Sequence, residues 1–366
     1  MLQVLPALQG GGVERGTLEV AAELVRRGHR SLVVSAGGRL LPQLLAGGSE
    51  HISCPLGSKS VSSLRYIPWL RRLLKSARVD IVHARSRLPA WITWLAWSGM
   101  DAATRPRFIT TVHGLYSVNA YSAVMMKGER VIVVSDAARD YVLKHYPAVD
   151  PARLSVIYRG VDLALYPRGF TPRESWLADW YRRYPQLQHR YVITLPGRVG
   201  PRKGVFDFID LIAGLTHAGH DVHGLIVGEI ARRDRKLARQ LNTAAKAAGI
   251  AEAITCTGFR EDVREIVSVS SAVVSLSGYP GAFGRSVNEA LSLGIPVAGY
   301  DHGGVGEQLA RHFPAGLVPP GDTATMTERL AGWIAAPPGM TGVQPYTLEH
   351  MLDKTIDLYQ QVTAVP

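Results

Sequence analysis

The 366-residue sequence predicts an α/β protein built of two Rossmann-like domains that face one another across a cleft. Short apolar runs rich in β-branched residues alternate with helical patterns, which is typical of parallel sheets. The alternation lapses once near the middle of the chain and then starts afresh. Glycine or polar residues follow most predicted strands, at the end where open parallel sheets bind ligands.

The first half opens with a strand, a glycine-rich turn and a helix. Residues 2–5 are short and apolar, residues 10–12 are all glycine, and residues 13–27 carry apolar side chains near helical spacing. Gly28 is expected to cap this helix. Later strands of this half are predicted at residues 31–35, 79–83, 108–112 and 131–135.

The pattern breaks down between about residues 162 and 190, where prolines, a glycine and clustered Trp, Tyr and Arg interrupt it. We therefore expect a first domain over residues 1–165 and a second over residues 166–346. The strands of the second domain are predicted at residues 191–195, 223–227, 253–257, 272–276 and 296–300. A last amphipathic segment, within residues 347–366, is expected to form a helix that packs back on the first domain.

Composition narrows the class of protein. The hydrophobic content of 46% is enough for a buried core in each domain. The two cysteines, Cys54 and Cys256, have no partner at metal-ligand spacing, which favours a reducing compartment and argues against structural zinc. No apolar run approaches the roughly 18 residues of a membrane span, and the first residues lack the features of a signal peptide. We expect a cytoplasmic protein.

Positive charge is concentrated in the first half. Residues 1–170 hold 22 Lys and Arg against 11 Asp and Glu, whereas residues 171–366 hold 19 of each. Such asymmetry suggests an anionic partner: nucleic acid, the anionic inner membrane face or a phosphorylated glycolipid. A solvated basic face without a partner explains it equally well. Nucleic acid fits worst, because the basic residues are dispersed and no aromatic-interleaved basic motif is present.

Two features at predicted strand ends of the first half can carry chemistry. Gly11 and Gly12 would let backbone N–H groups at a helix N-terminus approach an anion or a sugar hydroxyl, although a plain tight turn explains the same residues. His113, followed by Gly114, would place an imidazole at the cleft, and a structural histidine is the alternative.

In the second half, Arg198 and Lys203 follow the first strand and precede an apolar helix. A planar guanidinium and a compact ammonium beside a helix N-terminus suit a diphosphate and can neutralise it without a metal ion. No acidic pair with D-x-D spacing follows a strand, so we predict no metal site and no cofactor. Surface solubility is the alternative role for the two cations.

The most informative stretch runs from residue 279 to residue 290, between two predicted strands. Its glycines lead into a helix whose free amides could hold phosphate and sugar hydroxyls. Glu289, one turn into that helix, could accept hydrogen bonds from the vicinal hydroxyls of a ribose, or could be an ordinary exposed glutamate. The predicted binding residues of this stretch are Gly281, Ala282, Phe283, Gly284, Arg285, Ser286, Val287 and Glu289.

With these motifs assembled, the chain resembles retaining glycosyltransferases of family 4, which have the GT-B fold. The likeness lies in the order of the Gly-Gly-Val start, Thr-Val-His-Gly-Leu-Tyr, Val-Val-Ser-Asp, G-R-x4-K-G, Thr-Gly-Phe and F-G-x4-E-A. Three stretches, Val-His-Ala-Arg-Ser-Arg, Ala-Phe-Gly-Arg-Ser and Asp-His-Gly-Gly-Val, look like bacterial enzymes of lipopolysaccharide-core assembly.

The resemblance implies a role for each matched residue. Gly12 would approach the donor diphosphate and the acceptor, and His113 would lie near the reacting centre. Arg198 and Lys203 would bind the diphosphate and Glu289 the ribose. The backbone of Gly258 and Phe259 would contact the nucleobase, and the amides of Ser286 and Val287 the phosphate. The first domain would then bind the acceptor and the second the nucleotide sugar.

One position departs from the family pattern. The family has two glutamates eight positions apart, and this chain has Gly281 where the first of them belongs. That glutamate usually holds hydroxyls of the donor sugar. A natural variant that binds sugar through backbone amides, a substituted glutamate and an inactive homologue all explain the glycine.

The sequence therefore predicts a metal-independent, retaining transferase that moves a hexose, with a UDP-hexose as the expected donor. Its acceptor would be a hydroxyl of a lipopolysaccharide core or another surface glycan, and the basic first domain would contact the anionic inner membrane peripherally. The alternative, from a different class, is a sugar-nucleotide or glycolipid binding protein without turnover.

Overall fold

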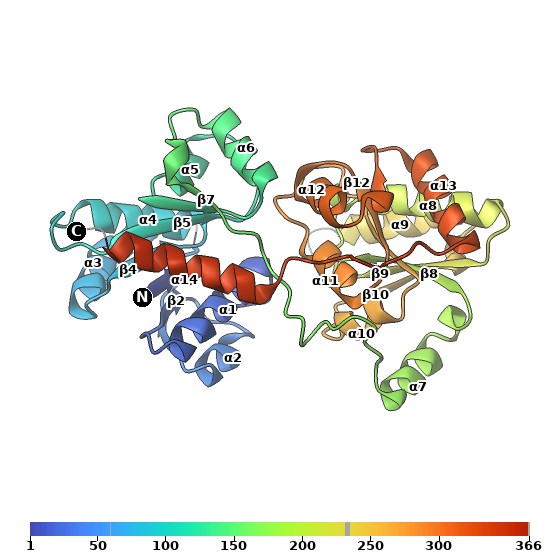
Figure 1. The fold of residues 1–366 in the computed structure, drawn as a ribbon, viewed down its shortest axis with the longest axis horizontal. Helices are drawn as coiled ribbons and strands as arrows, with labels where there is room; N and C mark the ends of the chain where they lie inside the picture. The colour runs from blue at the N-terminus through green and yellow to red at the C-terminus, as the bar shows by residue number, and fades with distance from the viewer. Residues whose placement is uncertain (59, 231–234, 365–366) are drawn as a thin grey trace. The chain divides into compact units, whose positions relative to one another are not determined.

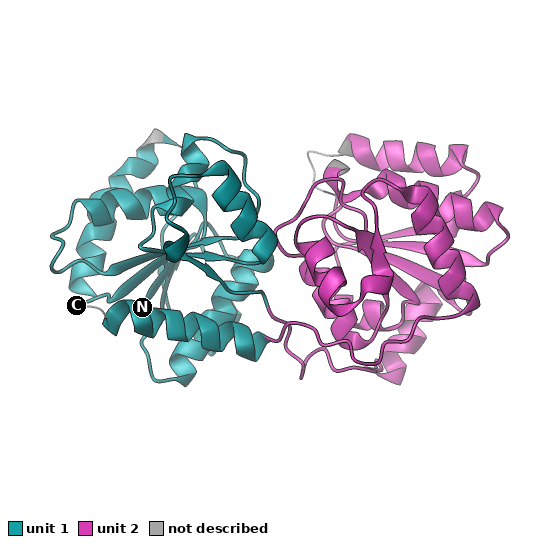
Figure 2. Cartoon of the chain, turned by 45° about the horizontal axis from the view of Figure 1, so that its top comes forward, with its two compact units in different colours: residues 1–159, 348–366 teal, residues 160–347 magenta. Residues whose placement is uncertain are grey.

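The computed structural model describes residues 1–58, 60–230 and 235–364, which form two compact units (Figure 2). Unit 1 comprises Met1–Arg159 and Leu348–Pro366, and unit 2 comprises Gly160–Thr347. The first boundary lies before the one expected from the sequence, because the segment after Gly160 packs on unit 2. Phe170 lies against the core of that unit, and the amide of Gly169 donates to the carbonyl of Leu293 at 3.1 Å.

Unit 1 is built on a parallel sheet that has seven strands in the described residues, in the order β3-β2-β1-β4-β5-β6-β7 (Figure 1). Most of its central strand residues are buried, as expected of a parallel sheet with helices on both faces. The strands are β1 (Leu2–Val4), β2 (Leu32–Ser35), β3 (Glu50–Ser53), β4 (Ile81–Ala84), β5 (Arg107–Val112), β6 (Arg130–Val133) and β7 (Leu154–Val156).

Helices connect these strands and cover the sheet. They are α1 (Gly12–Arg26), α2 (Leu41–Ala46), α3 (Tyr66–Ser76), α4 (Arg87–Ser98), α5 (Ala120–Ala123), α6 (Asp136–His145) and α14 (Leu348–Ala364). The last helix, α14, lies beside α1 (Figure 1). Its buried Met351 and Ile356 join a cluster with Val20 and Leu24 of α1, so the end of the chain completes the core of unit 1.

Unit 2 has a second parallel sheet, with six strands in the described residues and the order β10-β9-β8-β11-β12-β13. Its strands are β8 (Tyr191–Pro196), β9 (Val222–Val227), β10 (Ile254–Gly258), β11 (Ala272–Ser275), β12 (Val297–Tyr300) and β13 (Leu317–Val318). Its helices are α7 (Glu174–Arg183), α8 (Val205–His217), α9 (Arg235–Ala247), α10 (Val263–Ser268), α11 (Arg285–Leu293), α12 (Gly303–His312) and α13 (Thr323–Ala335).

The predicted fold class is confirmed: each unit is a parallel α/β domain. The strands that the sequence did not predict are β3, β7 and β13, which lie at sheet edges. Each is short, and β3 and β7 have no fully buried residue, so they lack the apolar runs that marked the central strands. No described helix is long and apolar enough to cross a membrane.

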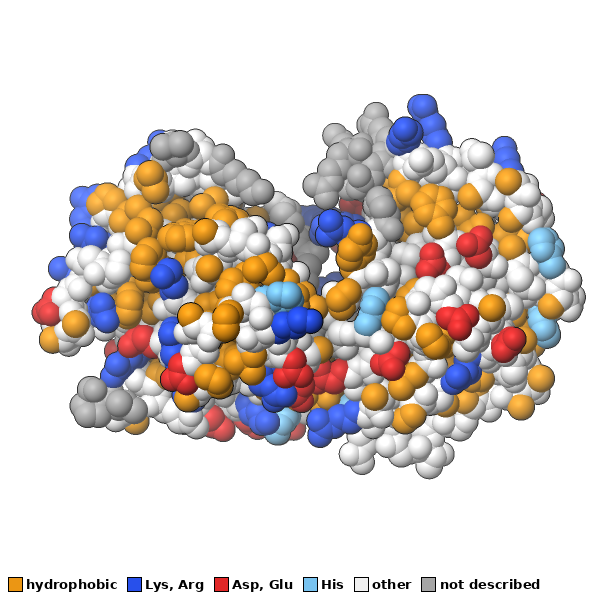
Figure 3. Space-filling model, turned by 90° about the horizontal axis from the view of Figure 1, so that it is seen from above, with side chains coloured by type: hydrophobic (Ala, Val, Ile, Leu, Met, Phe, Trp, Pro, Cys, Tyr) orange, Lys and Arg blue, Asp and Glu red, His pale blue; other side chains and the backbone are white. Residues whose placement is uncertain are grey.

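One face of unit 1 combines exposed hydrophobic side chains with basic ones (Figure 3). Figure 3 shows hydrophobic side chains spread over this face, with lysines and arginines along its outer margin. The exposed apolar residues of unit 1 include Leu64 and Val118, each about half exposed.

Candidate active site

Both sheets have a topological switch point beside the first strand of their unit. In unit 1, β1 lies between β2 and β4, and in unit 2, β8 lies between β9 and β11. Open α/β sheets bind ligands beyond the carboxyl ends of their strands at such points. The predicted residues form two sets: the loops after β1 and β5 in unit 1, and the loops after β8, β10 and β11 in unit 2.

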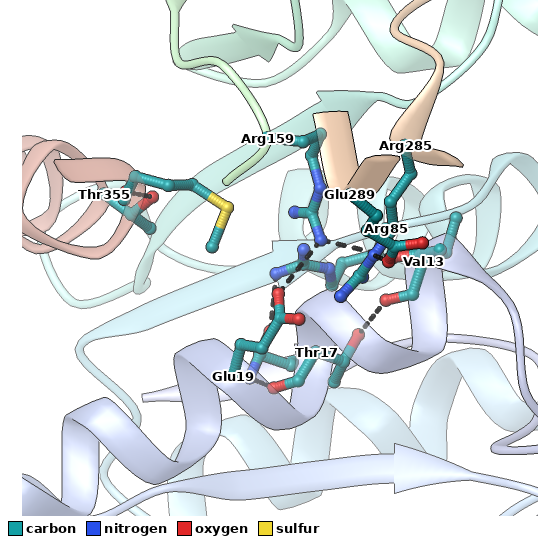
Figure 4. A network of polar contacts seen from close by, with 11 residues as sticks. Val13, Thr17, Glu19, Arg85, Arg159, Arg285, Glu289 and Thr355 are labelled. Atoms are coloured by element: carbon teal, nitrogen blue, oxygen red, sulfur yellow. Dashed lines mark hydrogen bonds and ion pairs between the residues drawn. The ribbon is translucent and has the colours of Figure 1, made fainter. Parts of the chain in front are cut away.

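The glycine-rich turn of unit 1 begins α1. Gly11 is the N-cap residue and Gly12 the first residue of the helix. The carbonyl of Gly12 accepts a hydrogen bond from Nη2 of Arg159 at 3.2 Å, and the same guanidinium is 3.3 Å from Glu19 (Figure 4). A side chain on Gly16 would overlap this guanidinium. Glycine at position 16 therefore makes room for the arginine that holds the turn.

His113 lies directly after β5 and is half-buried. Its Nε2 atom is buried and has no hydrogen-bond partner among the described residues, while its backbone amide donates to the hydroxyl of Tyr116 at 3.4 Å. Burial, and then the charges of Arg85 and Arg159, hold the pKa of His113 well below its usual value. The imidazole is therefore neutral near pH 7 and has a hydrogen-bonding position left for a ligand.

Arg198 and Lys203 lie in the loop between β8 and α8. Both are exposed, and no carboxylate of the described residues lies within ion-pair distance of either. Partial desolvation, and then repulsion from Arg198, lower the pKa of Lys203. Gly204 ends the loop with a φ of 67°, and a side chain there would overlap the carbonyl oxygen of Leu276. The close approach fixes the two cations beside the end of β11.

The loop after β11 is tied to its neighbours by Ser277, which the sequence analysis did not single out, and by His302 and Gly304 of the Asp-His-Gly-Gly-Val stretch. The Ser277 hydroxyl is 2.9 Å from the carbonyl oxygen of Arg202, and Nε2 of His302 is 2.7 Å from the Ser277 carbonyl oxygen. The amide of Gly304 donates to the carbonyl of Gly281 at 2.8 Å. The Asp-His-Gly-Gly stretch after β12 was the sequence signal for this contact, since its glycines admit the neighbouring backbone.

Glu289 lies on the first turns of α11, where its carboxylate accepts a hydrogen bond from Nε of Arg285 at 2.8 Å. Gly284 caps this helix with a φ of 94°. The amide of Val287 donates to the carbonyl of Gly284 at 3.1 Å, so it is already engaged within the turn. For Ser286, the described residues offer the amide no such acceptor. Of the two amides expected to hold phosphate, only that of Ser286 is therefore available.

The other predicted residues divide into packed and open positions. Ala282 and Phe283 are buried, and the ring of Phe283 lies 5.8 Å from that of Tyr346. Their side chains are thus structural, and only their backbone could face a ligand. Gly258 ends β10 with a φ of 73°, and Phe259 is half exposed beside it.

Gly281 is the position where the sequence departs from the family pattern. Its φ lies outside the left-handed region, and a Cβ atom there would have no atom within 4 Å. Residues other than glycine can therefore adopt the backbone conformation of Gly281. The backbone of this loop can accept a side chain at position 281.

A second contact that the sequence analysis did not predict joins α11 to the backbone of Tyr346. The buried side chain of Asn288 donates from Nδ2 to the carbonyl of Tyr346 at 2.8 Å and accepts from the Tyr346 amide at 3.0 Å. No periodicity signals such a contact, because the two residues are far apart in the chain. Among the described residues no group of three His, Cys, Asp or Glu side chains could hold a metal ion.

Comparison with known proteins agrees with this arrangement. Residues 10–165 match the model of Glycosyltransferase Family 4, and residues 181–342 match that of Glycosyl transferases group 1. A glycosyltransferase from Rickettsia africae has the same fold, with a TM-score of 0.88, 27% identity and coverage of 100% of this chain and 98% of that one. This chain is a glycosyltransferase of the GT-B fold.

Two relatives resemble the transferase over most of its length. Alpha-maltose-1-phosphate synthase of Mycolicibacterium smegmatis is 26% identical over 78% of this chain and 79% of its own. Phosphatidyl-myo-inositol mannosyltransferase of Mycobacterium leprae is 25% identical over 87% and 83%.

Two further solved structures share the fold of the transferase. Anabaena Alr3699/HepE, solved in complex with UDP and glucose, has a TM-score of 0.83 and 18% identity, with 98% of each chain covered. WaaG, a glycosyltransferase involved in lipopolysaccharide biosynthesis, has a TM-score of 0.71 and 17% identity, with 100% of this chain and 98% of that one covered.

Proposed function

We propose that the transferase moves a hexose from a UDP-linked donor to a hydroxyl of a phosphorylated surface glycolipid, of the lipopolysaccharide-core kind. In this proposal the anomeric configuration is retained and no divalent metal is needed. The observation that carries it is the pair Arg198 and Lys203, two cations without a carboxylate partner in the described residues, at the switch point of unit 2.

The donor assignment rests on the chemistry around that pair. Desolvation and then repulsion from Arg198 lower the pKa of Lys203, and a bound diphosphate would counteract both while being neutralised by the two cations. Glu289, oriented by Arg285, is placed to accept hydrogen bonds from a ribose. HepE, whose structures contain UDP and glucose, is a protein of the same fold that supports UDP as the nucleotide.

In the proposed reaction the bond between the anomeric carbon and the UDP oxygen breaks, and a bond to the acceptor oxygen forms on the same face. The acceptor proton passes to an oxygen of the departing phosphate. Arg198, Lys203 and the N-terminus of α11 would stabilise the charge that develops on UDP. The neutral imidazole of His113 would hold a sugar hydroxyl, for which its buried Nε2 has a vacant hydrogen-bonding position.

The acceptor assignment rests on charge and on relatives. All of the net charge of +11 comes from residues 1–170, and an anionic glycolipid complements that charge. One relative is a phosphatidyl-myo-inositol mannosyltransferase, and WaaG is involved in lipopolysaccharide biosynthesis. Both support a phosphorylated lipid-linked acceptor.

A second candidate function follows from Gly281. A sugar-nucleotide binding homologue without turnover would keep the cation pair and Glu289 and lack the family's first glutamate. The two candidates differ in turnover and not in nucleotide binding.

The decisive experiment incubates the full chain with several UDP-hexoses and a phosphorylated lipid A core acceptor in the presence of EDTA. UDP release and the anomeric configuration of the product are followed by NMR. Acceptor-dependent release with retention supports the proposal. Turnover that is lost in EDTA and restored by magnesium or manganese contradicts the metal-independent reaction, and tight UDP binding without transfer selects the second candidate.

A further inference from the structure

A small cavity of about 10 Å³ lies inside unit 1, between the sheet and α14. Its polar lining consists of His83, Arg85, Thr111, Arg159 and Thr355, and the rest of the lining is apolar. A space of this size admits about one particle of the size of water. The proposed transfer reaction does not use this cavity.

Two guanidinium groups border the cavity, and both are buried: Arg85 is 2% and Arg159 8% exposed. Arg159 has Glu19 as its ion-pair partner. Arg85 donates to the neutral amide oxygen of Gln3 at 2.7 Å, and its Nε atom is buried without an acceptor. The Glu19 carboxylate also acts on the charge of Arg85, so in the described part of the chain two buried guanidinium groups share one carboxylate.

The other polar groups around the cavity cannot supply the missing negative charge. The ring nitrogens of His83 lie 2.7 Å from the hydroxyl of Tyr359 and 2.6 Å from that of Thr111, so both hydrogen-bonding positions are occupied. Thr355 donates its hydroxyl to the carbonyl of Met351 at 2.7 Å. A buried charge without compensation destabilises a fold, and an arginine cannot lose its proton to avoid this cost.

We propose that unit 1 binds one chloride ion in this cavity, beside Arg85 and Arg159. Among common anions, a small monoatomic one comes nearest to the size of this space, and a carboxylate or a phosphate is larger. Water would fill the same volume but would leave the charges of Arg85 and Arg159 against the single carboxylate of Glu19. The ligand class is thus a small halide, bound by residues of unit 1.

The ion would have a structural consequence for the predicted acceptor side. Arg159 is the last residue of unit 1 before the chain enters unit 2, and it also holds the carbonyl of Gly12. A halide that fixes Arg159 would stabilise the glycine-rich turn and the packing of α14 on the sheet. Halide binding would therefore stabilise unit 1 without being part of the transfer reaction.

Bromide, which scatters anomalously, tests the site directly in crystals of the full chain grown with bromide in place of chloride. The expected result is an anomalous peak in the cavity lined by Arg85 and Thr355. Density for water without an anomalous signal overturns the proposal, and so does a peak found only at the protein surface.

A solution measurement tests the same site independently of crystals. The unfolding temperature of the full chain should rise saturably with sodium chloride or bromide, compared with sodium gluconate at the same ionic strength. Gluconate is too large for the cavity. Equal unfolding temperatures in the three salts overturn the proposal.

Variants then locate the effect. Arg85→Gln removes the charge and should abolish the difference between chloride and gluconate, whereas Arg72→Gln, at an exposed arginine of α3, should keep it. If Arg85→Gln does not fold, Thr355→Val, which alters the lining of the cavity, should raise the chloride concentration at half-effect several-fold. An unchanged chloride response in Arg85→Gln, or in Thr355→Val where the first variant is unfolded, contradicts the assignment.

Discussion

Lys203 is the residue on which the donor assignment can be tested most sharply. Its ammonium is partly desolvated beside Arg198 and lacks a carboxylate partner among the described residues. We expect Lys203→Ala to weaken UDP binding by roughly ten- to a hundredfold, since a charge-assisted hydrogen bond contributes about 1.5–3 kcal/mol. Calorimetric titration with UDP measures this, and Lys246→Ala, at an exposed lysine of α9, is the matched control. An unchanged affinity of Lys203→Ala for UDP would contradict the assignment of Lys203 to the donor diphosphate.

Gly281 tests how the donor sugar is held. Because its φ is ordinary and its Cβ position is open, Gly281→Glu should leave the unfolding temperature nearly unchanged. If position 281 faces the sugar, the carboxylate should tighten UDP-hexose binding relative to UDP, or raise the transfer rate. Gly278→Glu, at another open glycine of the same loop, is the control and should do neither. No change in Gly281→Glu would show that position 281 does not face the sugar.

His223 makes stability depend on pH. It is fully buried in β9, its Nε2 lies 2.9 Å from the hydroxyl of Thr255, and burial, then Arg190, lower its pKa to about 4. The unfolded chain binds the proton near pH 6.5, so stability falls as pH decreases from about 6.5 towards 4. At pH 5 the loss is about 2 kcal/mol.

His223→Gln should remove this part of the pH dependence, because glutamine cannot take up the proton. Urea unfolding at pH 7 and pH 5 gives the difference, and the exposed His29→Gln should leave it unchanged. A pH dependence that is equal in His223→Gln and in the parent chain would contradict the interpretation.

At the scale of elements, the loops after the strands decide the geometry of the site. Gly204 lets the β8–α8 loop press against the end of β11, where a side chain would overlap the backbone of Leu276. We expect Gly204→Ala to destabilise unit 2 by more than the roughly 1 kcal/mol that a left-handed φ alone costs a non-glycine residue. It should also weaken UDP binding, because Lys203 is displaced.

Gly219→Ala is the matched control for that change. Gly219 also has a left-handed φ, of 85°, but no atom lies within 4 Å of its Cβ position. Thermal unfolding of the two variants separates the cost of a left-handed φ from the cost of the overlap with the backbone of Leu276. Equal losses of stability would mean that the contact of Gly204 with β11 is not rigid.

The central elements could be predicted from the sequence because their apolar runs are set by burial on both faces of a sheet. The position of Arg198 and Lys203 after the first strand of unit 2 could be predicted for the same reason, because the two residues follow such a run. Three edge strands could not, because β3 and β7 have no fully buried residue and β13 has only two residues. Nor could the contacts of Ser277, His302 and Asn288, which join loops that only the tertiary fold brings together.

At the scale of the whole molecule, the order of the strands places the loops after β1 and β8 at the switch points of their sheets, while His113 follows β5 and Gly258 ends β10. Sequence patterns predicted the alternation of strands and helices but not the order of the strands in each sheet. The buried Arg85 illustrates the same limit. It directly follows β4 in the sequence, where it resembles an ordinary polar residue. Its charge is buried because β1, β5 and α14 enclose it, which the sequence alone does not reveal.

The excess of positive charge in the first half gives the last prediction. Helix α3 buries Leu70 and Leu74, while Arg72 and Lys75 are exposed on it and Arg78 is exposed just beyond it. Arg71 of the same helix is half-buried and donates to the carbonyl of Ala96. It therefore fixes α3 to α4, and is no part of a surface for lipid.

We expect the full chain to bind vesicles that contain anionic lipid and to be released by salt, which screens such contacts. Replacement of Arg72, Lys75 and Arg78 by glutamine should weaken binding roughly a hundredfold at low salt, since each basic residue near the surface contributes about 1 kcal/mol. The control replaces three exposed basic residues of unit 2: Arg173, Arg182 and Lys246. Vesicle sedimentation over a range of salt concentrations distinguishes the two. Equal losses of vesicle binding in both triple variants would mean that net charge alone drives the contact. No loss in either would mean that Arg72, Lys75 and Arg78 are solvated and do not contact lipid.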